Sequence, residues 1–370
     1  MSTDDLPEPD RVEGALHPRD TATLFGQGDA EAGFLAAQSA GRLHSGWLIS
    51  GPAGIGKATL AYRIAAFLLA GAAQDGLPAP ARTLEVDRTS RAATLIRAGA
   101  HPQLCVIRRG ADDKTGRLRS QITVDEVRRL RAFFQLSATD GGHRVVIVDA
   151  ADDMNASAAN AILKVLEEPP AGAVLLLVSH QPSRLLPTIR SRCRTLRCAP
   201  LGGADLGAAL ARQGIDLASP EAVAELAGGS VGQAIRLIAQ GGLDTYADLV
   251  RLLADLPRID RPAAIRLAES CTGRNNEPRF AHMVDLLERL VSRAARAGLL
   301  GEPPAEGAAG EAQLLSRISP HDRAARAWAG LQQDLSARVR HGKAVNLDPA
   351  GLILDMLWRI EETARTTAAA

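Results

Sequence analysis

The sequence predicts an α/β domain on a parallel sheet, then a helical lid and a separate all-helical C-terminal domain. Two runs of branched apolar residues, at 145–148 and 174–178, have the pattern of strands buried on both faces of a sheet. Amphipathic helical segments, at 57–70 and 155–168, alternate with these runs, which indicates βαβ units. After Pro200, helical periodicity interrupted by glycine pairs replaces the strand pattern, so the remainder is predicted to be helical.

Local signals place the remaining elements of the α/β domain. The pair Thr123 and Glu126 has the spacing of a capping box, so a helix is predicted to begin there. Pro169 and Pro170 stop the helix before them. We also expect a helix over 31–40, strands over 47–49 and 104–107, a loop or insertion over 71–90, an apparent strand carrying Cys193 and Cys198, and a loop over 301–311.

These patterns give four predicted segments. Residues 1–15 are acidic and contain proline, which predicts disorder. The α/β domain is expected over 16–199, the helical lid over 200–243 and the C-terminal helical domain over 244–370.

Composition excludes several classes of protein. The formal net charge of +1 and the aromatic content of 3% do not indicate a protein that binds nucleic acid by itself. No apolar run is long enough to span a membrane, and the acidic N-terminus does not resemble a signal peptide, so a cytoplasmic protein is expected. None of the four cysteines forms a C-x-x-C pair, so we expect reduced thiols and no metal site.

A phosphate-binding loop is predicted between the first strand and its helix. The segment 51–57 fits G-x-x-x-x-G-K, with Gly51, Gly54 and Gly56 freeing backbone N–H groups for phosphates and Lys57 adding a charge. The next residue would normally carry a hydroxyl for Mg²⁺, but it is Ala58. Thr59 is one helical step away, about 100° around the axis, and cannot simply replace it. The loop is therefore expected to bind ATP or ADP while holding Mg²⁺ poorly.

An acidic residue ends the strand at 145–148. Asp149 is placed to hold Mg²⁺ through water, although a helix N-cap or turn residue would give the same pattern. The next residue is Ala150 rather than a glutamate that could polarise water, and Asp152 is expected in the following turn. With Ala58, this predicts no significant ATP hydrolysis by the chain itself.

Arg192 lies in a basic cluster after the strand at 174–178. Its guanidinium could stabilise a transferring phosphoryl group if presented to a neighbour. It could equally form a surface salt bridge, or it could alternate with Arg194 on one face of a strand and contact DNA phosphates. Residue chemistry alone leaves these alternatives open.

Several motifs resemble the clamp-loader ATPase family of AAA+ proteins. They are Ala100–Pro102, Ile122–Asp125, Gly41–His44, the segment Ala159–Pro170 and the triplet Ser191–Cys193. The resemblance is dense over about 18–200 and general beyond. It implies a P-loop AAA+ domain, a lid and a collar domain that assembles into a five-membered ring. In that ring Arg192 would act in trans on ATP held by an adjacent motor subunit.

The resemblance also assigns individual positions. Lys57 and Asp149 match the phosphate-loop lysine and the strand-end acid, and Ser179 weakly matches a sensor residue. The sensor arginine of motor subunits would fall near Gly232 and is absent. Many relatives carry a four-cysteine zinc module, but residues 71–100 contain no cysteine, so zinc is not expected.

Three functions remain as hypotheses. The first is a clamp-loader subunit of DNA replication that does not hydrolyse ATP, with gamma/tau motor and delta subunits, the sliding clamp and primed DNA as partners. The second is an ATP-hydrolysing motor of the gamma/tau type, against which Ala58, Ala150 and Gly232 count. The third is an independent nucleic-acid-binding protein.

Overall fold

The computed structural model describes residues 8, 14–71, 82–112, 116–135, 142–273, 276–301 and 303–368. The chain folds into two compact units, one of Met1–Asp216 with Ser230–Gly232 and one of Leu217–Gly229 with Gln233–Ala370. Most of the predicted disordered segment 1–15, and residues 72–81 of the predicted insertion, lie outside the described residues. The predicted limits of lid and collar stay predictions.

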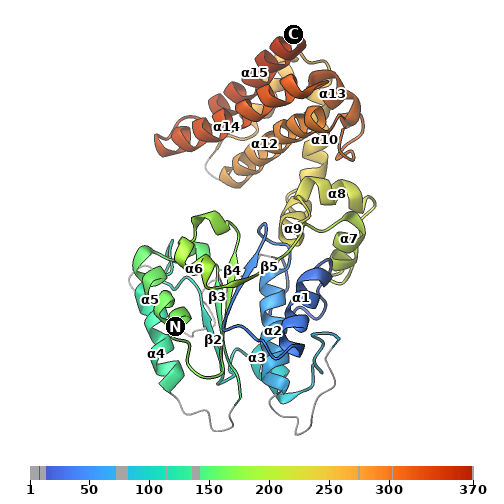
Figure 1. Cartoon of the computed structure of the whole chain (residues 1–370). Helices are drawn as coiled ribbons and strands as arrows, with labels where there is room; N and C mark the ends of the chain where they lie inside the picture. Colours follow the sequence, from blue (N-terminus) through green and yellow to red (C-terminus); the bar gives the residue numbers. More distant parts are fainter. Residues whose placement is uncertain are drawn as a thin grey trace. The chain divides into compact units, whose positions relative to one another are not determined.

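The first unit is built on a five-stranded, fully parallel sheet in the order β2-β3-β4-β1-β5 (Figure 1). This confirms the predicted α/β fold. Three predicted strands extend by one residue at each end, because flanking residues also join the ladders. The strands are β1 (Gly46–Ser50), β2 (Leu104–Ile107), β3 (Arg144–Asp149), β4 (Ala173–Ser179) and β5 (Arg194–Arg197).

Two layers of helices bury the two faces of this sheet. Alternate strand residues such as Trp47 and Val145 pack with α1 and α2, while their neighbours Leu48 and Val146 pack with α4 and α5. The central strands β1, β3 and β4 are buried throughout, which explains why their sequences are continuously apolar. The helices are α1 (Gly28–Ser39), α2 (Lys57–Gly71), α3 (Arg91–Arg97), α4 (Val124–Gln135), α5 (Ala156–Glu167), α6 (Pro187–Ser191) and α7 (Gly203–Ala211), with short 3₁₀ turns η2 (Ala151–Asp153) and η3 (Pro182–Arg184).

Side-chain caps fix where two of these helices begin. The Thr123 N–H donates to Glu126 Oε2 over 2.9 Å, and the Thr123 hydroxyl donates to the same oxygen. The glutamate half of the predicted capping box is therefore present. At α5, Asn155 Oδ1 accepts a hydrogen bond of 2.9 Å from the Ala158 N–H.

The second unit is helical around one large apolar core. This unit also contains a buried polar cluster around Glu311. The Glu311 carboxylate accepts hydrogen bonds from Tyr246, from Arg293 and from the Gly307 N–H. No helix among the described residues is long and apolar enough to cross a membrane. The helices are α8 (Pro220–Ala227), α9 (Val231–Ala239, whose first two residues belong to the first unit), α10 (Gly242–Leu252), α11 (Arg261–Glu269), α12 (Glu277–Leu300), α13 (Glu311–Ile318), α14 (Asp322–Ala344) and α15 (Pro349–Ala368).

Candidate functional site

The predicted phosphate loop connects β1 to α2, at the edge of the sheet where the parallel strands end. We call this edge the carboxyl edge and the opposite edge the amino edge. Gly51 has φ 149° and Gly54 has φ 76°, conformations that side chains rarely adopt. A Cβ at Gly51 would lie 2.4 Å from the Cys198 carbonyl oxygen, and one at Gly54 would lie 2.2 Å from Ser230 Oγ. Neighbouring segments thus enclose the loop closely enough to require glycine there.

Lys57 begins α2 and is almost completely buried, with 3% of its surface exposed. Its Nζ donates a hydrogen bond to the Pro52 carbonyl oxygen of its own loop. Burial lowers the pKa of Lys57 to about 8, although the nearby Cys198 and Asp149 act in the opposite direction. The lysine therefore lies inside the loop, where the motif predicts it.

The residues that follow Lys57 and β3 differ from those that usually hold Mg²⁺ beside a phosphate loop. Ala58 has no hydroxyl to offer, and Thr59 is buried in α2. At the end of β3, Asp149 is buried and the following Ala150 cannot act on water. Among the described residues, no group of three or more His, Cys, Asp or Glu side chains is arranged to hold a metal ion.

Asp152 organises the ends of β3 and β4, a role that sequence reasoning missed. The hydroxyl of Ser179 donates to Asp152 Oδ1 over 2.7 Å, and the backbone N–H groups of His180 and Gln181 donate to Oδ2. Both carboxylate oxygens of Asp152 are therefore engaged by the end of β4 and the two residues that follow it. Asp152 lies in the predicted turn, but nothing local indicated that its partners would come from the next strand.

Gln27 and His180 also adjoin the loop without having been predicted. Gln27 Nε2 donates to the Ile55 carbonyl oxygen (3.0 Å) and to the Ala199 carbonyl oxygen (2.8 Å), so it links the phosphate loop to the segment after β5. Burial, followed by the charge of Lys57, lowers the pKa of His180. His180 is therefore neutral near pH 7. No sequence motif marks either residue.

Position 232 lies beside the phosphate loop. The Val231 N–H donates to the Gly54 carbonyl oxygen over 3.0 Å. The Gly232 nitrogen would lie 3.5 Å from a Cβ at Gly54. Gly232 therefore lies against the predicted phosphate loop, and it has no side chain to present there.

Arg192 lies at the opposite edge of the sheet from its own phosphate loop. It follows α6 and precedes β5, and its carbonyl oxygen would be 3.1 Å from a Cβ at Gly46, the first residue of β1. Ser50, just before the loop, pairs with Arg197 at the other end of β5. The height of the sheet, on the order of 15 Å, therefore separates Arg192 from the loop.

The Arg192 side chain is held by two contacts. Nη2 lies 3.0 Å from Glu167 Oε1, and Nη1 donates to the Thr188 carbonyl oxygen over 3.1 Å. Both charged side chains are well exposed, Arg192 by 39% and Glu167 by 46%. Arg192 lies outside β5, so the suggested strand pair of Arg192 and Arg194 is wrong. Arg194 instead lies over the Trp47 ring, 5.5 Å from its centroid.

Burial raises the pKa of all four cysteine thiols. Cys193 and Cys198 flank β5 rather than lying in it. All four cysteines are free, and burial raises the pKa of Cys193 to about 12 and that of Cys198 to about 11.

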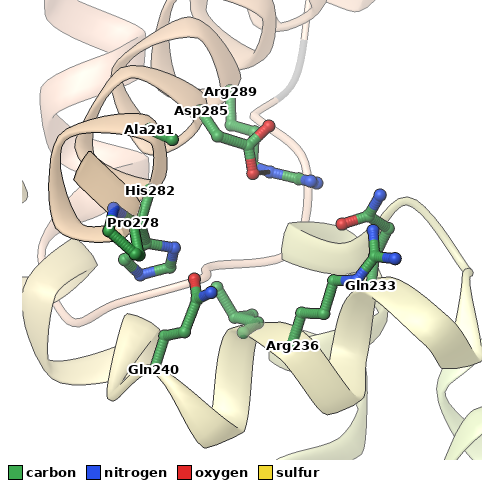
Figure 2. A pocket seen from close by; sticks show the side chains of 9 residues that line it. Gln233, Arg236, Gln240, Pro278, Ala281, His282, Asp285 and Arg289 are labelled. Atoms are coloured by element: carbon green, nitrogen blue, oxygen red, sulfur yellow. Dashed lines mark hydrogen bonds and ion pairs between the residues drawn. The ribbon is translucent and has the colours of Figure 1, made fainter. Parts of the chain in front are cut away.

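A separate hollow of about 210 Å³ lies within the second unit, between α9 and α12 (Figure 2). Figure 2 shows Arg236 and Gln240 on one side and His282, Asp285 and Arg289 on the other. Arg289 Nε donates to Asp285 Oδ2 over 2.9 Å. The lining contains none of the predicted site residues.

The part of the chain that a family model matches lies in the first unit. Residues 26–202 match the family model described as DNA polymerase III, delta subunit. The chain is 41% identical over 227 residues to DNA polymerase III subunit delta' of Pseudomonas aeruginosa, a match covering 60% of this chain and 64% of that protein. It is 35% identical over 166 residues to subunit delta' of Escherichia coli, covering 45% and 46%.

A second group of relatives carries another subunit name. The chain is 28% identical over 319 residues to DNA polymerase III subunit gamma/tau of Mycobacterium tuberculosis, covering 77% of this chain and 52% of that protein. The chain thus spans less than two thirds of the length of each of these three relatives. The resemblance that the motifs at 159–170 and 191–193 predicted is confirmed.

Proposed function

We propose, from the similarity of this chain to the delta-prime subunits of DNA polymerase III, that it is a clamp-loader subunit that activates a neighbour and does not hydrolyse ATP itself. It would act in the cytoplasm within the replication machinery, helping to load the sliding clamp onto primed DNA. Its partners would be gamma/tau motor subunits and a delta subunit in a hetero-pentamer.

One observation carries the trans role of Arg192. The arginine lies at the amino edge of the sheet, while the phosphate loop of the same chain lies at the carboxyl edge. An arginine that stabilises phosphoryl transfer must contact the phosphate directly. Arg192 can therefore serve only a nucleotide bound by another subunit.

The chain's own loop supports the second half of the proposal. The loop retains its glycines and Lys57, so a nucleotide can bind there. The positions at 58, 150 and 232 lack the hydroxyl, the carboxylate and the guanidinium that hydrolysis requires. These absences disfavour a gamma/tau-type motor, although the chain also shares similarity with gamma/tau proteins.

Reconstitution of the complex with Arg192→Ala tests the trans role. We expect intact assembly, with hydrolysis at the adjacent site reduced by about 10³-fold or more, because the transition state loses its trans cation. The readouts are size-exclusion chromatography and single-turnover ATP hydrolysis with DNA and clamp present. Arg190→Ala is the matched control, since Arg190 is exposed in the same segment. Unchanged hydrolysis in an intact Arg192→Ala complex would refute the proposal.

A further inference from the structure

The ion pair between Arg192 and Glu167 joins the end of α5 to the residue that ends α6. It is a single contact of 3.0 Å between one guanidinium nitrogen and one carboxylate oxygen. The other contact of the guanidinium is to the neutral carbonyl oxygen of Thr188. Glu167 is thus the one anionic partner of Arg192 among the residues that the structure describes.

Two properties of this pair make it easy to separate. It is monodentate, whereas strong arginine–carboxylate pairs use two parallel N–H···O contacts. Both partners are more than one third exposed, so water and salt screen their attraction. Such a pair favours one position of the Arg192 side chain but is weak enough to break when another anion arrives.

Arg192 cannot remain paired with Glu167 while its guanidinium binds a phosphate. A phosphate bound by the Arg192 guanidinium would lie next to the Glu167 carboxylate, and two anions at such short range repel strongly. The phosphate carries the larger negative charge, so it displaces the carboxylate rather than sharing the guanidinium. Until then, Glu167 neutralises the charge that would act on the neighbour.

We infer that Glu167 is a positioning residue that holds Arg192 in a resting position and competes with the neighbour's γ-phosphate for its guanidinium. The inference rests on the proposed function, because it presupposes that Arg192 acts in trans. Formation of a productive interface then exchanges one anion for another at the same guanidinium. The result is a low rate of hydrolysis before DNA and clamp arrive.

Glu167→Gln in the reconstituted complex tests the competition. Glutamine keeps the size and an acceptor oxygen but removes the charge. We expect the kcat of hydrolysis without DNA and clamp to rise about 2- to 5-fold, the range that corresponds to loss of an exposed ion pair. The KM for ATP and the stimulated rate should stay unchanged, because the neighbour's own loop binds the nucleotide.

Two further variants make the result specific. Glu168→Gln is the matched control, because Glu168 is the next residue, is exposed, and makes no ion pair among the described residues. A complex with this variant should hydrolyse ATP without DNA and clamp at the wild-type rate. The double variant Glu167→Gln with Arg192→Ala should show no increase over Arg192→Ala alone. A merely structural effect of Glu167 would not depend on Arg192.

The outcomes separate this inference from the proposed function. If Arg192→Ala abolishes stimulated hydrolysis but Glu167→Gln leaves the unstimulated rate unchanged, the resting pair is wrong and the trans role stands. A fall in the stimulated rate with Glu167→Gln would also overturn the inference, since Glu167 would then orient Arg192 for catalysis. If Arg192→Ala has no effect, the proposed function itself fails.

Discussion

Lys57 is a cation that the fold buries. Its position at the start of α2 follows from the motif, but its burial does not, because the surrounding groups Asp149 and Cys198 come from the ends of two other strands. The same limit applies to Asp152, Gln27 and the counter-ion of Arg192, whose partners are distant in sequence. Motif spacing predicts which residues reach a site, whereas contacts across the sheet require the structure.

The buried charge predicts a pH-dependent effect of Lys57→Met on stability. The pKa is about 8 in the folded chain and 10.5 as the ordinary value, so the unfolded chain binds this proton more tightly. The charge therefore destabilises the fold below pH 8, and this cost disappears as the pH rises towards 10.5. We expect Lys57→Met to raise the free energy of unfolding at pH 7 by up to about 3 kcal/mol, and less at pH 10.

Urea unfolding of the wild type and of Lys57→Met, each at pH 7 and at pH 10, measures the change in the free energy of unfolding. Arg63→Met is a control on the same helix, because arginine keeps its charge at both values and its effect should not change with pH. A Lys57→Met variant that is less stable than the wild type at pH 7 would contradict the expectation.

At the scale of elements, local sequence was sufficient where a signal was strong. The strands at 145–148 and 174–178 were predicted to within one residue, because their apolar runs are buried on both faces. Helices α3 and α6 were missed, since seven and five residues are too few to show helical periodicity. The missed α6 matters most, because it determines that Arg192 lies outside β5.

The cap of α5 gives a prediction for Asn155→Ala. Asn155 Oδ1 accepts the hydrogen bond of the Ala158 N–H, and without it this donor at the helix start loses its side-chain partner. We expect a loss of about 1 kcal/mol in the free energy of unfolding, measured by urea denaturation. Asn160→Ala, at an exposed position within the same helix, should cost nothing or stabilise slightly. Equal effects of the two variants would mean that the cap does not stabilise α5.

At the scale of the whole molecule, each compact unit has its own core and its own tryptophans. Trp47 lies in the core of the first unit, and Trp328 and Trp358 belong to the second. In the second unit, Arg293 donates to the fully buried Glu311, and burial raises the pKa of the adjoining Tyr246 well above its usual range. Sequence periodicity predicted these helices, but nothing in it indicated the buried ion pair.

Arg293→Met should destabilise the second unit selectively. Removal of the guanidinium leaves Glu311 buried without its cation, which costs about 3–5 kcal/mol. In a Trp47→Phe background, tryptophan fluorescence reports the second unit. Its urea midpoint should fall relative to the same background with Arg293 intact. Arg296→Ala removes only an exposed pair with Glu225 and should cost less than about 1 kcal/mol. A similar midpoint for both variants would contradict a stabilising role of the buried pair.

The placement of Arg192 and the phosphate loop at opposite edges of one sheet gives the first unit a direction. In the proposed ring, contacts between such units would be head-to-tail, because the edge that offers Arg192 would have to meet the edge of the next unit that holds a nucleotide. This chain would offer Arg192 to a neighbour at its amino edge. An arginine offered by another neighbour at its carboxyl edge would serve no hydrolysis, because the proposed function gives this chain none. Loss of the contact on that second side would therefore remove no active site from the proposed ring.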